Sequence, residues 1–352
     1  MLRLGLLLSG GGVRVRRRVA ELDAGEDLAT GLAAGGAPRA TLDTAERMAA
    51  DEAATVLDRV VAAGWRWLIP GDEDFPEHLA AISDPPLGLF VRGRLRKGKR
   101  VAIVGSRKAT PYGLQVARLL GEELGREGVV MVSGMARGVD AAAHRGALAV
   151  SGPTWAVWGT GPDRIYPPEH AELAEEIANA GAVLTEFPPG TPPRPHHFPQ
   201  RNRILAGVAT AVVVVEAAAR SGALVTARLA VEEGREVLAV PGNIFSGASV
   251  GPNTLLRVGA RPLLTPRDLF DAIGHQPTRQ ENKPDRSGLL RFIDGGESLS
   301  VDQLAARAQM EVSSVAADLL TLELSGEIER RPDGRYARIR GVPLIPVDSK
   351  DA

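Results

Sequence analysis

The sequence predicts an α/β protein built around a doubly wound, mostly parallel sheet. Between residues 99 and 265, short apolar runs alternate with helical stretches, which is the pattern of repeated strand–helix–strand units. The runs are rich in valine and lack polar alternation, as expected for strands that helices cover on both faces. Six runs meet this description: 100–104, 129–132, 154–158, 182–186, 211–215 and 236–240.

Composition limits the class of protein. A chain of 352 residues exceeds one typical domain, so two or three compact units are expected. The absence of cysteine excludes disulfide scaffolds, thiolate nucleophiles and cysteine-bound metals. No stretch approaches 18 consecutive apolar residues, so we expect a cytoplasmic protein without a membrane partner.

The region before the sheet divides into two parts. Residues 1–64 are rich in alanine, leucine and arginine and are interrupted by glycines at 10–12 and 35–36, which predicts a small N-terminal domain of short helices. Runs at 65–70 and 87–93 read as strands that lead into the central domain. We therefore place the central domain at residues 65–265.

A second, smaller domain follows the sheet. Residues 266–286 are polar and contain proline, and are predicted to be a linker. Three short helices are expected near 288–294, 301–308 and 313–324, and then two strands flank an Asp333-Gly334 turn, which is a strong hairpin signal. Three helices and a hairpin predict a winged-helix domain over 287–340, with a tail at 341–352.

The end of the first strand run has the chemistry of a phosphate site. The net charge is −1, but residues 99–265 contain 17 basic and 14 acidic residues, so the central domain is the basic part of the chain. Gly105, Ser106, Arg107 and Lys108 follow the run, and Thr110-Pro111 then caps a helix. Glycine permits close backbone approach, and the guanidinium and helix N-terminus favour an anion. The alternative is a tight turn with a solvated arginine.

The second run ends in a similar segment that contains Ser133, Gly134 and Arg137. Asp140 and His144 then lie four residues apart on the predicted helix, a spacing that could hold a metal ion. We favour a capping aspartate and a packed histidine, because no third ligand is evident nearby.

The loop after the fourth run suits single-stranded nucleic acid. Residues 187–199 contain six prolines, so the loop is stiff and orders its side chains at little entropic cost. Aromatic rings beside guanidinium groups bind exposed bases and phosphates. The candidates are Arg194, His197, Phe198, Arg201, Asn202 and Arg203. The alternative is that the rings fold back onto the domain.

The last two runs complete one edge of the predicted sheet. Glu216 is either a general acid or base or a buried structural hydrogen-bond acceptor. The other candidates at these strand ends are Ser221, a predicted helix cap, with Gly222, Thr226, Gly242 and Asn253. Because the carboxyl ends of parallel strands share one edge, these residues should form a cleft. No G-x-G-x-x-G follows the first strand and no G-x-x-x-x-G-K-[ST] occurs, which argues against dinucleotide binding and excludes a P-loop.

Six segments in order resemble the DNA-processing protein A family, also called DprA or Smf. They are VAIVGSRKATPYG, SGMARGVDAAAHRGAL, GTGPDRIYPPEH, FPPGTPPRPHHFPQRNRILAG, EAAARSGALVTARLAVEEGREVLAVPGN and GPNTLLRVGA. The resemblance implies an extended Rossmann-like domain that binds single-stranded DNA without catalysis or cofactor. It also implies a homodimer that loads a RecA-type recombinase during natural transformation. Residues 8–14 look like a degraded helix-hairpin-helix, and Ala223 replaces a serine that is frequent in the family.

Two rival functions are weaker. A nucleotide-processing enzyme such as a phosphoribohydrolase would need a P-G-G-x-G-T-x-x-E block, which the chain lacks. A duplex-specific regulator would read DNA through the third helix of the winged domain, but that helix contains Asp318 and Glu323 and no basic residue. The predicted wing is basic, so we expect this domain to contact a partner protein or to touch DNA only by its wing, which carries Arg330, Arg331, Arg335 and Arg338.

Overall fold

The computed structural model contains two compact units, residues 1–278 and residues 279–352. The described residues are 4, 53–278, 287–290, 292–293, 298–324, 328–331 and 333–338. Most of the predicted N-terminal helical domain, including the segment at 8–14, lies outside them, as does the tail at 341–352. The end of that N-terminal region is described, and it is helical as expected, in α5 (Ala53–Ala62).

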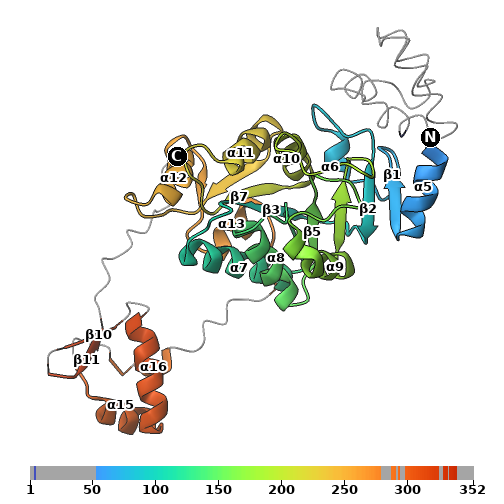
Figure 1. The fold of residues 1–352 in the computed structure, drawn as a ribbon. Coiled ribbons are helices and arrows are strands. Elements are labelled where there is room, and N and C mark those ends of the chain that lie inside the picture. The colour runs from blue at the N-terminus through green and yellow to red at the C-terminus, as the bar shows by residue number, and fades with distance from the viewer. Residues whose placement is uncertain are drawn as a thin grey trace. The chain divides into compact units, whose positions relative to one another are not determined.

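All six predicted runs of the central domain are strands, in a sheet of nine ordered β1-β2-β6-β5-β4-β3-β7-β8-β9 (Figure 1). In this order, all strands from β6 across β3 to β9 are parallel to their neighbours. At the other end of the sheet, β2 pairs antiparallel with β6 and β1 pairs antiparallel with β2. Their bounds are β1 Trp65–Leu68, β2 Leu89–Gly93, β3 Arg100–Val104, β4 Val130–Ser133, β5 Thr154–Val157, β6 Ala182–Thr185, β7 Ala211–Val214, β8 Glu236–Ala239 and β9 Arg261–Pro262.

Helices cover both faces of the sheet because successive strand residues point to opposite sides. Val101 and Ile103 pack with helices on one face, and Ala102 and Val104 pack with helices on the other. The first face carries α7 (Pro111–Arg126), α8 (Val139–Ala149), α9 (Ala171–Ala180) and α13 (Pro266–Ala272). The second carries α6 (Glu77–Ala80), α10 (His197–Val208), α11 (Gly222–Glu232) and part of α12 (Val250–Arg257), and short 3-10 helices lie at Pro168–His170 and Gly247–Ser249.

The winding of the sheet creates a crevice at its centre. The chain runs outward from β3 through β4 and β5 to β6, and then returns to β7 beside β3. The helices that follow β3 and β7, α7 and α11, lie on opposite faces. At such a switch point the two connections separate, and ligands of doubly wound proteins bind there.

The α/β unit continues beyond the boundary predicted at residue 265. Helix α13 lies in the predicted linker, yet its Leu269 and Phe270 are buried against the sheet. Pro266 stands at the first turn of this helix, which begins with a Thr265–Asp268 capping box. The division between the units falls after Thr278 instead.

The second unit has the predicted order of three helices and a hairpin. The helices are α14 (Ser287–Leu290), α15 (Val301–Ala308) and α16 (Val312–Leu324). Strands β10 (Ile328–Arg330) and β11 (Tyr336–Arg338) pair antiparallel, and Leu299 bridges to Tyr336. Leu304, Leu319 and Ile328 are buried in a separate core that joins the helices to the hairpin. In the described parts of both units, no helix combines the length and apolar character needed to cross a bilayer.

Candidate nucleic-acid interface

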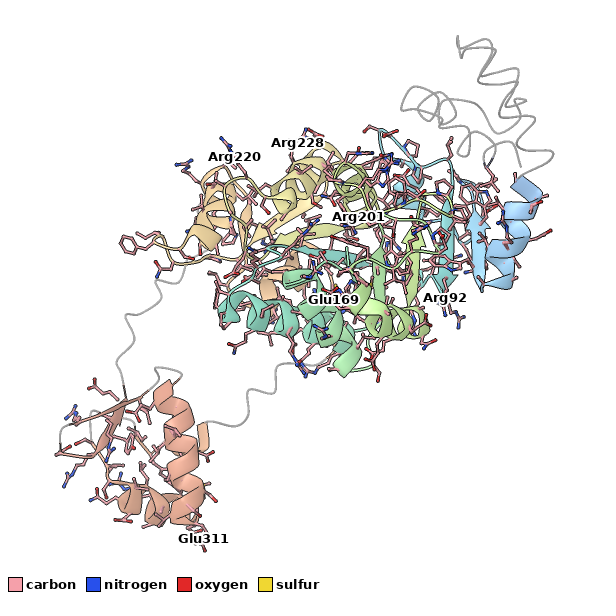
Figure 2. The ribbon with its side chains drawn as sticks, in the orientation of Figure 1. Arg92, Glu169, Arg201, Arg220, Arg228 and Glu311 are labelled. Carbon is pink, nitrogen blue, oxygen red and sulfur yellow. The ribbon has the colours of Figure 1, made fainter. Side chains whose placement is uncertain are left out.

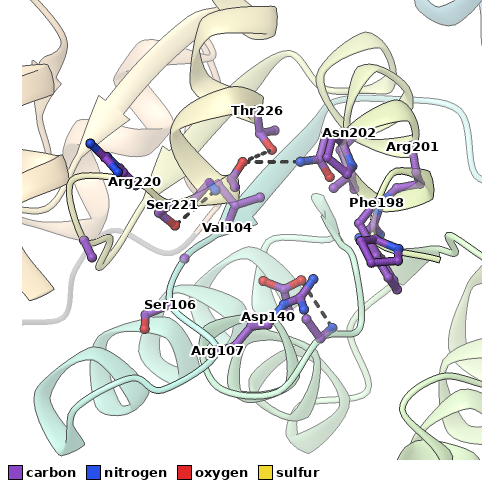
Figure 3. A pocket seen from close by; sticks show the side chains of 18 of the residues that line it. Val104, Ser106, Arg107, Asp140, Phe198, Arg201, Asn202, Arg220, Ser221 and Thr226 are labelled. Carbon is purple, nitrogen blue, oxygen red and sulfur yellow. Dashed lines mark hydrogen bonds between the residues drawn. The ribbon is translucent and has the colours of Figure 1, made fainter. Parts of the chain in front are cut away.

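A cavity of about 540 Å³ opens at the carboxyl ends of the central strands, where the winding predicts a crevice. Arg201 reaches it from inside the domain, while Arg220 projects from the surface nearby (Figure 2). Its walls come from the segments that follow β3, β4, β5, β6 and β7 (Figure 3). We call this cavity the rim pocket, and half of the predicted site residues line it: Gly105, Ser106, Arg107, Phe198, Arg201, Asn202, Ser221, Gly222 and Thr226.

Other lining residues were not selected from the sequence. Tyr166 belongs to the GTGPDRIYPPEH segment, which carried the family resemblance but no chemical signal of its own. Arg220 directly precedes the helix cap Ser221, so its position at a helix start was the available signal. Ala136 and Asp140 join the lining because the segment after β4 folds back toward β3.

The turn after β3 presents Arg107 to the pocket. Thr110 caps α7 by accepting from the Gly113 N–H, and Pro111 follows it, as predicted. The Glu216 carboxylate accepts from the Thr110 N–H at 2.8 Å and from its hydroxyl at 2.5 Å, so Glu216 fixes the start of α7. This contact matches the structural interpretation of Glu216. A Cβ on Gly105 would lie 2.6 Å from Val139, so the close packing of this turn requires glycine.

Phe198, and not the preceding His197, faces the pocket. The Phe198 ring is half-buried and lies 5.5 Å from the Tyr166 ring, and the exposed Arg107 guanidinium lies 5.1 Å from its centroid. His197 is 8% exposed, its ring packs on Phe187, and its Nδ1 lies 3.1 Å from the Pro192 carbonyl. Burial lowers the pKa of His197. The two alternatives for this loop thus both occur, one ring in the pocket and one folded back.

Arg201 and Asp140 form the charged floor of the rim pocket. Arg201 is 4% exposed, its Nη1 donates to the Val157 carbonyl, and its Nε has no hydrogen-bond partner within the described structure. Burial lowers the pKa of Arg201 to about 10, so it remains a cation at neutral pH. The guanidinium lies directly against Gly134, where an added Cβ would meet its nitrogens at 2.4 Å.

Asp140 holds the segment after β4. Its carboxylate accepts from the backbone N–H groups of Gly134 at 3.1 Å and Ala136 at 3.3 Å. Burial raises the pKa of Asp140 and the Arg201 charge opposes that shift. His144 packs elsewhere, with Nδ1 2.7 Å from the Thr154 hydroxyl. These contacts match the structural interpretation of Asp140 and His144. In the part of the chain that the structure describes, no three or more histidine, aspartate or glutamate residues form a cluster that could hold a metal ion.

Arg203 lies outside the rim pocket, two residues beyond Arg201. It donates to both Glu186 oxygens at 2.6 Å and to Asp84 at 3.0 Å, so its charge is paired and buried. This network ties α10 to β6 and to the segment before β2. Sequence spacing could not separate the two arginines, because both follow the same proline-rich loop.

The remaining predicted residues do not line the pocket. Ser133 donates to the Ile103 carbonyl, and Arg137 is paired with Glu169. Gly242 and Asn253 exchange two hydrogen bonds with each other, at 3.2 and 3.0 Å. Gly134 supports the floor from beneath, and Lys108 and Arg194 are exposed outside the pocket.

The N-terminus of α11 adds backbone donors to the rim pocket. The Ser221 hydroxyl accepts from the Ala223 N–H, which confirms the predicted cap, and the space around the Gly222 Cα is open. Asn202 donates to the Gly222 carbonyl at 3.3 Å and so joins α10 to this helix start. The helix dipole favours an anion here. Three arginines and a single carboxylate line the pocket, so it is electropositive, and the helix dipole adds to this potential.

The fold and pocket define an anion-binding protein of the doubly wound α/β class, joined to a winged-helix unit. The chain matches the family described as DNA recombination-mediator protein A over residues 66–274, and the DprA winged helix domain over residues 274–334. It belongs to that family of recombination mediators.

Individual relatives agree with this assignment. Protein Smf of Escherichia coli is 42% identical over 290 residues, which are 78% of this chain and 77% of the relative. DNA processing protein DprA of Bacillus subtilis is 40% identical, over 62% of this chain and 75% of its own length. The crystal structure of DNA processing protein A from Streptococcus pneumoniae superimposes with a TM-score of 0.69 at 34% identity, covering 76% of this chain and 95% of the other.

Proposed function

We propose that the protein binds single-stranded DNA in the rim pocket and acts there as a recombination mediator. The observation that carries the proposal is the placement of Arg107 over the Phe198 ring beside the buried Arg201 cation. A related structure supports it: DNA processing protein A from Helicobacter pylori has a TM-score of 0.54 at 31% identity, covers 59% of this chain and 94% of its own, and is described as having a unique single-stranded DNA binding mode.

Each part of the pocket has a distinct role in this proposal. Arg107 is exposed and pairs with a phosphate, while the positive end of the α11 dipole attracts a second phosphate. Phe198 offers a ring face or edge to an unpaired base. Arg201 is fixed in the floor and supplies a constant positive potential. Phosphate contacts position a strand without reading its sequence, so binding should tolerate any sequence.

The test is a titration of fluorescent oligothymidylate against the protein at several salt concentrations. Affinity should fall with salt at a log–log slope of about −0.7 for each phosphate neutralised. Duplex DNA and mononucleotides should compete weakly, because a duplex has no free base faces and a mononucleotide has one phosphate group. A slope near zero, or turnover of a nucleotide, would contradict the proposal and favour the rival enzyme class.

We infer further that the protein forms a homodimer and loads a RecA-type recombinase during transformation. The family description as a recombination mediator supports the second part. For the dimer, β9 stands at the open edge of the sheet, and the apolar Val258 and Leu264 near it are 72% and 73% exposed. Sedimentation should show a dimer that Val258→Glu weakens. Filaments of the recombinase on single-stranded DNA should form faster in the presence of the protein than in its absence.

A further inference from the structure

The loop between β8 and α12, residues 240–249, exposes two adjacent large apolar side chains. Phe245 is 91% exposed and Ile244 is 79% exposed, the two highest values among the large apolar residues that the structure describes. A ring left in water costs free energy unless a partner covers it. The roles assigned to the rim pocket do not use these residues.

The conformation of this loop is fixed by hydrogen bonds. The Asn243 side chain accepts from the Phe245 N–H at 2.9 Å, and the Asn243 carbonyl accepts from the Ser246 N–H at 2.9 Å. Ser246 in turn accepts from the Ala248 N–H at 3.3 Å. A ring held outward by an ordered turn binds a partner at a lower entropic cost than a ring on a free loop.

The same loop is bonded to the wall of the rim pocket. Ala217 donates to the Ala248 carbonyl and accepts from the Gly251 N–H, both at 2.8 Å. Ala218 and Arg220, one and three residues after Ala217, line the pocket. Figure 3 shows Arg220 on the side of the pocket opposite Phe198 and Arg201. The rim therefore continues from Phe198 across the pocket to Arg220 and on to the segment that carries Phe245.

Charge indicates which kind of partner covers this loop. The two segments that build this side of the rim, 217–231 and 237–267, contain no aspartate or glutamate. Arg220 is exposed and makes no ion pair with any residue that the structure describes. An acid-free surface with a cation next to a projecting ring is complementary to an unpaired polynucleotide, whose phosphates and bases it matches in turn.

We propose that Phe245 is a second base-stacking platform, reached by a single strand that leaves the rim pocket past Arg220. This inference rests on the proposed function and adds an exit direction for the strand. A strand that fills only the pocket does not touch Phe245. A longer strand gains a stacked base, so the benefit of Phe245 depends on oligonucleotide length.

The test compares Phe245→Ala with the unchanged protein on oligothymidylates of about 4 to 16 nucleotides, the range of known single-strand site sizes. Affinity for the longest strand should fall about tenfold, which corresponds to about 1.4 kcal/mol. Affinity for the shortest strand that binds should not change. Phe245→Tyr keeps an aromatic ring and should bind the longest strand as tightly as the unchanged protein. The fluorescence of a Phe245→Trp variant should be quenched only by the longer strands.

Val61→Ala is the matched control, because Val61 is a 55% exposed apolar residue on α5 in the same unit. It should bind every length like the unchanged protein. The inference is overturned if Phe245→Ala binds all lengths normally, loses equal affinity at all lengths, or changes only the sedimentation of the protein. The last result would assign Phe245 to a protein contact. If the unchanged protein binds no oligonucleotide, the proposed function itself fails. This titration is made before any variant is measured, so the two failures are distinguishable.

Discussion

The rim pocket and the winged-helix unit differ in where their arginine side chains lie, although the α/β and winged-helix folds both commonly bind nucleic acid. The pocket gathers Arg107, Arg201 and Arg220 around one carboxylate. In the winged unit, residues 308–329 contain no lysine or arginine, Asp318 on α16 is exposed, and Glu311 stands at the start of that helix (Figure 2). Its exposed basic groups lie elsewhere, with Arg307 on α15 and Arg330 and Arg331 at the hairpin. We therefore expect the charge that each unit presents at its surface, rather than its fold, to decide which unit contacts DNA.

The largest effect on binding should come from removing a cation from the pocket. Arg107→Ala should weaken binding of oligothymidylate by about thirtyfold, or about 2 kcal/mol, because it deletes a charge-assisted phosphate contact. The salt slope should become about 0.7 less steep. Arg118→Ala removes the same charge from the surface of α7, where Arg118 pairs with Glu122, and should change neither quantity. Equal losses in both variants would mean that only net charge matters.

Phe198 should have the next largest effect. Phe198→Ala removes a stacking surface of the pocket and should lower affinity by about tenfold, or about 1.4 kcal/mol, for single strands of any sequence. His197→Asn alters the adjacent ring, which is buried against Phe187, and should reduce thermal stability more than affinity. The opposite ranking would assign base stacking to His197. Anisotropy titrations and thermal melts of the two variants decide between them.

Acid should destabilise the α/β unit more than the winged-helix unit. His144 is fully buried, and burial lowers its pKa to about 3 from 6.5. The Thr154 hydroxyl donates to the Met131 carbonyl, so the His144 Nδ1–H donates to Thr154 and the ring is neutral. Because the unfolded chain binds the extra proton, this stability is complete above pH 6.5 and is lost progressively as pH falls toward 3.

Between pH 7.5 and 5.5 the free energy of unfolding of the α/β unit should therefore fall by about 1.4 kcal/mol through His144. His144→Asn, which keeps a donor for Thr154, should lose less over the same range. All four tryptophans lie in this unit, at 65, 67, 155 and 158, so urea unfolding followed by their fluorescence reports it alone. Residues 279–352 contain no histidine and should lack this dependence. Equal acid sensitivity of the variant and the unchanged protein would disprove the assignment.

The smallest effect should come from deleting the winged unit. Removal of residues 287–352 should change single-strand affinity by about threefold or less, because α16 presents acidic groups that repel phosphate. Replacing Arg330, Arg331 and Arg335 with alanine should reproduce whatever loss occurs, since these wing arginines are exposed. A loss above about tenfold on deletion would show that the winged unit is a principal DNA contact.

The architecture could be predicted from the sequence because buried strands have recognisable runs of apolar residues. Valine-rich runs without polar alternation identified all six central strands, and the Asp-Gly turn marked the hairpin. The caps at Thr110 and Ser221 were also predictable, because a cap depends on local chain chemistry. The end of the α/β unit was missed, because α13 is short and lies directly before the polar, proline-containing stretch 275–286 that indicates a linker.

The apolar runs thus predicted a doubly wound sheet from sequence alone, the charge count placed the basic residues in that domain, and the resemblance to the family followed from motif order. Only the tertiary structure decided which side chains share the pocket. Arg201 and Arg203 stand in the same tripeptide, yet one forms the pocket floor and the other is buried between Glu186 and Asp84. His197 and Phe198 are adjacent, yet only Phe198 lines the pocket. Helical residues one or two apart point in different directions, and their partners come from distant segments, so local sequence does not contain this information.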